Sequence, residues 1–244
     1  MQVQTRQGPA YGVARLTLAP NEPVRVEAGA MMAMSAGVTL QAKAEGGIMK
    51  SLKRAALGGE SFFVSTYTAP ASGGFVDVAA RLPGDITLHQ LTPGRALFIQ
   101  KGSWLANDVT VNLDTQWGGF RNMFGSEGGF IVRAEGQGNV VFACYGALEV
   151  WNLEAGQSIT VDTGHMVAYE DSITMGMRKA SGGGLVQSFK SGEGLVFDFT
   201  GPGRVWTQTR NPTELMGWIQ SFVGTSNSGP AGIGGIAGGL FGRD

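Results

Sequence analysis

Apolar and polar residues alternate in three separate stretches of the chain, and these stretches align without gaps. They read LAPNEPVRVEAGAMMA from Leu18, LTPGRALFIQKGSWLA from Leu91 and LEAGQSITVDTGHMVA from Leu153. Each begins with a leucine, has a turn residue that tolerates positive φ three places later, and continues with two apolar residues in alternation. A period of two is that of a half-buried strand, so each stretch predicts a turn followed by a strand. The shared glycines that follow these strands are Gly29, Gly102 and Gly164.

The correspondence continues beyond these stretches. Short strands are predicted at 38–40, 109–111 and 173–175. Later Gly-x-Val strands begin at Gly74, Gly138 and Gly203, which are 64 and 65 residues apart. So many features in fixed register predict an all-β chain of three tandem units, with a solenoid-like array as the competing interpretation.

The predicted boundaries are residues 18–90 for unit one, 91–152 for unit two and 153–210 for unit three. The first two units end on a strand that the third unit lacks, and the strand at Ala14–Leu18 fits the missing position. Residues 1–17 are therefore predicted to complete unit three, in the same chain or in a neighbouring subunit, which protects an otherwise open sheet edge.

Helices are predicted at few places. Residues 211–223 have apolar positions spaced for one broad helix face after Pro212, and a Gly-rich tail follows at 224–244. A short helix is also predicted at Ile48–Ala56, with shorter versions at 120–124 and 185–190. These short helices either cap the open end of each β unit or, for the basic segment 48–56, lie on an anionic membrane surface.

Composition limits the classes of function. Only 15% of the 244 residues are charged, against about 25% in a typical domain. This low fraction predicts that subunit contacts cover part of the surface. The net charge of −1 argues against a nucleic-acid partner. A single cysteine, Cys144, and no visible signal peptide or membrane span predict a cytoplasmic protein.

Candidate catalytic chemistry is sparse. His89 has no acid beside it in the sequence, and His165 occupies a position held by Ala30 and Ser103 in the other units. Cys144 lies between apolar neighbours, as core cysteines do. The Glu170-Asp171 pair is interpreted as a solvated turn. We therefore predict no catalytic, cofactor-binding or metal-binding residue, no cofactor, and no enzymatic activity.

The elements EAGAMMAMS, KGSWLAND and DTGHMVAYE, with the closing NPTELMGWIQSFV and the Gly-rich tail, resemble the altered-inheritance-of-mitochondria type family. This bacterial and archaeal family, with mitochondrial relatives, is catalogued as a domain of unknown function. The resemblance implies three fused domains similar to the tryptophan-attenuation RNA-binding protein (TRAP), a short double-stranded β-helix type of fold. It also implies trimers that form a nine-unit pseudo-ring. Mitochondrial relatives are linked to organelle architecture.

The sequence thus predicts a non-enzymatic, oligomeric β-scaffold or interaction protein. A homotrimer is expected because three fused units leave two open ends, which cyclic closure removes. One alternative is a membrane-surface adaptor that uses residues 48–56 and the tail. The other is a binder of a small ligand at clefts between units.

Overall fold

The computed structural model describes residues 1–44, 63–114, 131–180 and 195–223. The short helices predicted at 48–56, 120–124 and 185–190, and the Gly-rich tail at 224–244, lie outside the described residues. The chain divides into two compact units, Met1–Asn211 and Pro212–Asp244.

Strands make up nearly all of the first compact unit, and after β1 (Gln2–Arg6) they fall into three series of six. The first segment contains β2 (Val13–Leu18), β3 (Pro23–Glu27), β4 (Met31–Met34), β5 (Thr39–Ala44), β6 (Phe63–Thr68) and β7 (Gly74–Ala79). The second segment contains β8 (Ile86–Leu91), β9 (Ala96–Gln100), β10 (Trp104–Asp108), β11 (Val111–Asp114), β12 (Ile131–Gly136) and β13 (Gly138–Ala143). The third segment contains β14 (Leu148–Leu153), β15 (Ser158–Asp162), β16 (Met166–Glu170), β17 (Thr174–Lys179), β18 (Leu195–Thr200) and β19 (Gly203–Gln208).

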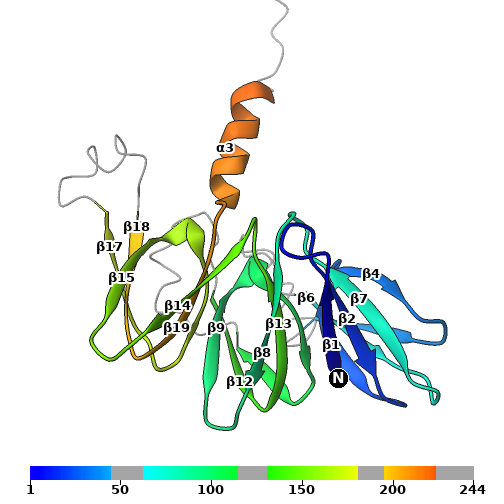
Figure 1. The fold of residues 1–244 in the computed structure, drawn as a ribbon. Coiled ribbons are helices and arrows are strands. Elements are labelled where there is room, and N and C mark those ends of the chain that lie inside the picture. Colours follow the sequence, from blue (N-terminus) through cyan, green and yellow to red (C-terminus); the bar gives the residue numbers. More distant parts are fainter. Residues whose placement is uncertain (45–62, 115–130, 181–194, 224–244) are drawn as a thin grey trace, which may run out of the picture. The chain divides into compact units, whose positions relative to one another are not determined.

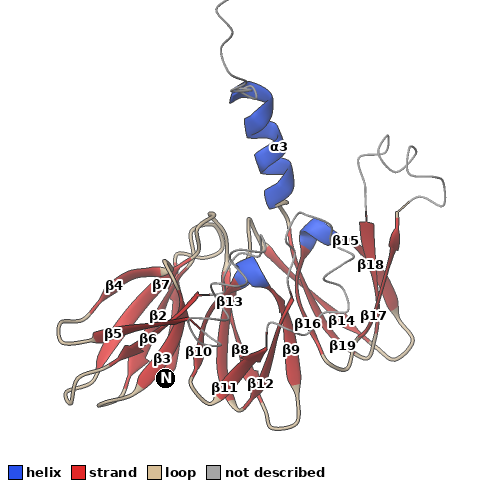
Figure 2. Cartoon of the chain, turned by 180° about the vertical axis from the view of Figure 1, so that it is seen from behind, coloured by secondary structure: helices blue, strands red, loops and turns tan. Residues whose placement is uncertain are grey.

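The strands form four antiparallel sheets, which follow one another in chain order across Figures 1 and 2. Their strand orders are β1-β2-β7-β4, β5-β6-β3-β10-β13-β8, β11-β12-β9-β16-β19-β14 and β15-β18-β17. Each segment therefore gives three strands to one sheet and three to the next, and the same order recurs in all three segments. The predicted all-β architecture is confirmed.

Two strand pairs join the segments. At the first junction β3 pairs with β10, with Val26 opposite Ala106, and at the second junction β9 pairs with β16, with Ile99 opposite Ala168. The registers are equivalent because these residues hold matching places in the aligned stretches. The two six-stranded sheets are thus each completed by consecutive segments.

Three hydrophobic clusters lie between successive sheets. The first contains Leu16, Val24 and Val26 of the first segment together with Leu105 and Val141 of the second. The second contains Leu97, Trp104 and Phe142 with Val167 and Trp206 of the third segment. The third contains Phe98, Tyr169, Phe197 and Phe199. Alternate residues of one shared sheet therefore serve two different cores.

The placement predicted for residues 1–17 is wrong. β2 pairs with β7 of the first segment, with Leu16 opposite Val76, and β1 pairs with the other edge of β2. The strands that were assigned to the ends of units one and two instead begin the following segments, since β8 pairs with β13 and β14 with β19. The physical reason is that only a short turn separates β2 from β3, and Leu16 and Leu18 enter the same core as Val24. The segment boundaries therefore fall before β8 and β14 and not at residues 91 and 153.

The helix predicted at 211–223 is confirmed as α3 (Pro212–Val223). It carries several exposed apolar side chains, among them Met216, Trp218 and Phe222. Trp218 and Phe222 form an edge-to-face pair with ring centroids 5.0 Å apart. No helix in the described part of the chain is long and apolar enough to cross a membrane.

Candidate functional site

The residues that carry chemistry in the sequence lie apart from one another. Among the described residues, no three or more His, Cys, Asp and Glu side chains are grouped to hold a metal ion. The ring Nδ1 of His165 lies 2.7 Å from the carbonyl oxygen of Gln208. Cys144 is buried, which raises the pKa of its thiol to about 11. Such a thiol is protonated at neutral pH, which agrees with the core role predicted for it.

One backbone hydrogen bond recurs in all three segments at the start of the last strand. The N–H of Phe75 donates to Ser35 Oγ at 2.9 Å, that of Asn139 to Asp108 Oδ2 at 2.7 Å, and that of Arg204 to Glu170 Oε2 at 2.9 Å. The three acceptors hold matching positions in the aligned stretches. This position therefore requires an oxygen acceptor, and in two segments the acceptor is a carboxylate.

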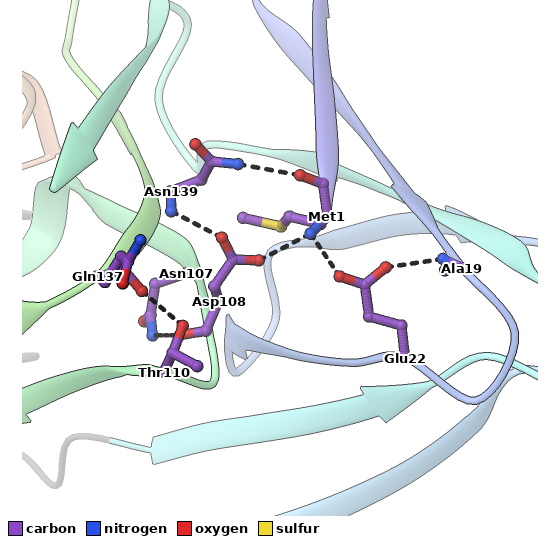
Figure 3. Close-up of polar contacts among 8 residues, drawn as sticks. All are labelled: Met1, Ala19, Glu22, Asn107, Asp108, Thr110, Gln137 and Asn139. Carbon is purple, nitrogen blue, oxygen red and sulfur yellow. Dashed lines mark hydrogen bonds and ion pairs between the residues drawn. The ribbon is translucent and has the colours of Figure 1, made fainter. Parts of the chain in front are cut away.

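The carboxylate at the first junction binds the chain's own amino group (Figure 3). The α-ammonium of Met1 donates to Asp108 Oδ1 at 2.9 Å and to Glu22 Oε1. Burial opposes charge on this amine, but the hydrogen bonds to Glu22 and Asp108 outweigh it and raise its pKa above 8.0. Burial likewise opposes charge on Glu22, but the hydrogen bonds from Met1 and from the Ala19 N–H outweigh it and lower the pKa of its carboxyl.

Gly138 allows Asp108 to approach the backbone at this junction. Its φ is +140°, in the region that favours glycine, and an added Cβ would lie 2.8 Å from Asp108 Oδ2. A side chain at this position would therefore displace the carboxylate from the Asn139 N–H.

The carboxylate at the second junction binds a side chain instead. Arg204 Nη2 lies 2.7 Å from Glu170 Oε1, and its Nε donates to the same oxygen at 2.8 Å. His89 faces this pair, with its Nδ1 3.5 Å from Arg204 Nη2 and its ring edge-to-face with Trp206. Burial and then the positive charge of Arg204 lower the pKa of His89, against a smaller opposite effect of Glu170. His89 is therefore neutral at pH 7 and part of the packing.

Asp171 lies in an exposed turn, as interpreted from the sequence, but Glu170 ends a strand and both carboxylates are paired. Glu170 binds Arg204, and Asp171 binds Arg95 at 3.0 Å while it accepts the Ala96 N–H at 2.9 Å. Asp171 thus links the third segment to the second, whereas Glu170 and Arg204 join two strands of the third segment, β16 and β19. Sequence reasoning missed both pairs because the partners lie 34 and 76 residues away. The available signal was that an oxygen-bearing side chain (Ser35, Asp108 or Glu170) recurs two residues after the alanine that ends each aligned stretch.

The outer sheets expose positions that are buried at both junctions. Leu105 and Val167 are 1% and 0% exposed, whereas the equivalent Met32 on β4 is 54% exposed. Ala106 and Ala168 are also buried, and the equivalent Ala33 is exposed. At the opposite end, Ile159 and Val161 on β15 are half-buried, while their counterparts on β3 and β9 are fully buried. β4 and β15 are edge strands, so each lacks the neighbour that its counterparts have.

Comparisons with known proteins agree with this architecture. The chain is 25% identical over 226 residues to an uncharacterized protein, M6_Spy0233, of Streptococcus pyogenes serotype M6, and the match covers 89% of each sequence. It is also similar to the crystal structure of protein SPYM3_0169 from Streptococcus pyogenes, with a TM-score of 0.76 and 23% identity. That likeness covers 91% of this chain and 99% of the other and shows a shared fold. A family model described as mitochondrial biogenesis AIM24 matches residues 3–210, and the chain therefore belongs to the AIM24 family.

Proposed function

We propose that the chain is a non-enzymatic scaffold whose copies join edge to edge through β15 of one copy and β4 of the next. One observation carries the proposal: the apolar positions that are buried at both internal junctions are exposed on β4 and only half-buried on β15. Exposed edge strands pair readily with other strands, and stable proteins usually cover them. The chain's low charged fraction of 15% supports the same interpretation.

The two internal junctions predict the register between copies. At the first, Asn107 lies opposite Arg25, and at the second, Tyr169 lies opposite Phe98. The equivalent pair between copies is Met34 opposite Thr160. Val161 would then lie opposite Ala33. The free edge of β4 would join the sheet β1-β2-β7-β4 to the sheet β15-β18-β17 of the next copy.

Closed rings are the expected assembly, because a head-to-tail contact either closes or grows into a filament. We propose a homotrimer, with three TRAP-like segments per chain and nine segments in the ring. The recurring strand order supports three equivalent segments. A cytoplasmic, reducing location and the lack of a nucleic-acid partner belong to the same proposal, supported by the free Cys144 and the net charge of −1.

A cross-linking experiment tests the interface. The double variant Met34→Cys/Thr160→Cys, in a Cys144→Ala background, should form disulfides between copies under mild oxidation. Covalent species should stop at three chains, about 77 kDa for chains of 25.5 kDa each. A matched control, Met34→Cys/Glu154→Cys, also has two exposed cysteines but places one in a turn outside β15. Equal cross-linking in both variants, or light scattering that shows a monomer at micromolar concentration, would refute the proposal.

A membrane-surface role is the second candidate, supported by the exposed apolar side chains of α3. Its only charged residue is Glu214, and the face that contains Trp218 and Phe222 suits the interface of a bilayer. Flotation with liposomes separates this role from the first. Binding that is lost in the Trp218→Ser/Phe222→Ser variant would support it, and a wild-type chain that stays at the bottom of the gradient would exclude it.

A further inference from the structure

Both junctions contain a carboxylate at an equivalent position, but the positively charged group that binds it differs between them. Asp108 and Glu170 hold equivalent positions. In each carboxylate one oxygen accepts a backbone N–H at the start of the last strand of the segment, from Asn139 on β13 or Arg204 on β19. The other oxygen binds a positive charge. At the second junction this charge is the guanidinium of Arg204. At the first, residue 139 is an asparagine, and the charge comes from the α-ammonium of Met1.

Met1 is bound through both of its backbone groups. Its ammonium reaches Asp108 on β10 and Glu22 in the turn before β3, and its carbonyl oxygen accepts a hydrogen bond of 2.9 Å from Asn139 Nδ2 on β13. The contacts span three parts of the fold that lie far apart in the sequence (Figure 3). The amino group and the carbonyl oxygen of Met1 together therefore tie the start of the chain to two strands of the second segment, β10 and β13.

The charge balance makes this group sensitive to modification. Two carboxylates face one ammonium, and no other ion pair of Glu22 or Asp108 is present in the described residues. An acetyl or formyl group on the nitrogen would convert the ammonium into a neutral amide with a single N–H. Glu22 and Asp108 would then face each other without a cation, which disfavours the folded arrangement.

We propose that the free α-amino group of Met1 is a structural cation of the first junction, and that N-terminal acylation or extension at this nitrogen opens that junction. The equivalent group at the second junction, Arg204, is a side chain and is unaffected by such modification. The amino terminus is thus a modification-sensitive site at which the first and second segments are coupled.

Reactivity of the amine tests the proposal directly. The full chain is treated at about pH 7.5 with pyridine-carboxaldehyde, which reacts selectively with unprotonated α-amines, and the rate of labelling is followed by intact mass. Labelling of the wild type should be slower than that of Glu22→Gln/Asp108→Asn, because the hydrogen bonds to Glu22 and Asp108 hold the amine as the unreactive ammonium and raise its pKa. Arg204→Gln is the matched control, since it removes a junction cation elsewhere and should label as slowly as the wild type. Equal rates for the wild type and the double variant would overturn the proposal.

A second measurement does not depend on the folding of that variant. A chain that carries one additional glycine before Met1 should exchange the backbone amides of β1 and of Asn139 at least about tenfold faster than the native chain, and the amide of Arg204 at the native rate. Unchanged exchange in β1 would show that the contacts of the amine contribute nothing to the junction. Uniformly faster exchange at both junctions would also refute the proposal, since it predicts a local effect.

Discussion

The two internal junctions have the same backbone pairing but differ in their core side chains and in the positively charged group that binds the carboxylate. In both, an inner strand of one segment pairs antiparallel with an inner strand of the next in an equivalent register. The first core is mainly aliphatic, with Tyr67 as its aromatic member, whereas the second contains Trp104, Phe142 and Trp206. The first is closed by the α-ammonium of Met1 and the second by Arg204 and His89.

This difference shows which features the junction needs. The strand register and an oxygen acceptor for the last strand are kept, while the volume of the core and the source of the positive charge vary. His89 occupies the position of Leu16, and Trp206 that of Asp77 on the open sheet. The proposed edge between copies would be a third version of the junction, with different side chains on the equivalent strands β4 and β15.

The largest effect is expected in the aromatic core. Trp104→Ala should lower the free energy of unfolding by about 3–5 kcal/mol, because the side chain is fully buried and its Nε1–H donates to Asn107 at 3.0 Å. Urea denaturation measures the loss. Trp151→Ala is the matched control, since Trp151 is half-exposed, and its loss should be about 1 kcal/mol. Equal losses would mean that the second junction is not stabilised by its aromatic core.

The edge between copies should respond next. Met32→Glu places a charge at a position whose counterparts Leu105 and Val167 are buried, so association should weaken at least about a hundredfold, or about 2.7 kcal/mol. Analytical ultracentrifugation follows the change. Leu40→Glu is the control, because Leu40 is equally exposed but lies on β5, away from the proposed contact. If both variants associate like the wild type, β4 is not the interface.

Alkaline pH should weaken the first junction alone. The pKa of the Met1 amine is raised in the folded chain, so its contribution is complete below pH 8.0 and is lost as the pH rises through the folded-state pKa. The loss should be about 1 kcal/mol, as for a partly exposed ion pair. Thermal unfolding between pH 8.0 and about pH 9.5 checks this. The Glu22→Gln/Asp108→Asn variant should lose less over the same range, and a parallel decline would contradict the assignment.

The smallest effect is expected at acid pH and at the second junction. The pKa of His89 is lowered, so the unfolded chain takes up a proton first and stability falls as the pH drops below 6.5. The groups that face His89 are Arg204 and Trp206 on β19 and Glu170 on β16. His89→Leu, which copies Leu16, should remove this decline of less than about 1 kcal/mol. A decline of the same size in the variant would assign it to other groups.

Strand positions could be read from the sequence because each depends on local alternation. Val24, Val26, Leu97 and Ile99 were predicted to face a core, and all four are fully buried. Ile159 and Val161 follow the same pattern but are only half-buried, because β15 lies at a sheet edge. Alternation reports the face of a strand and not the number of its neighbours.

Pairing between strands was harder to predict. The strand at Ala14–Leu18 was recognised, but its partner was assigned to the wrong segment, because the sequence pattern before each leucine fits both the end of one unit and the start of the next. The junction cations were missed for a different reason. The α-ammonium belongs to the backbone of Met1 and is not a side chain, so residue patterns do not reveal it. The pair Glu170–Arg204 forms only when β16 and β19 lie side by side.

The shared sheets also constrain how the protein is made. A ribosome that has released only the first two segments has exposed β11-β12-β9 without β16, β19 and β14, so Phe98 lacks the third-segment residues that cover it. The first junction can form at that stage, since its strands and Met1 have already emerged. Synthesis from the amino terminus therefore closes the sheets one after another, and a transcript truncated between segments would yield a product with one bare hydrophobic face, suited to recognition by chaperones and proteases.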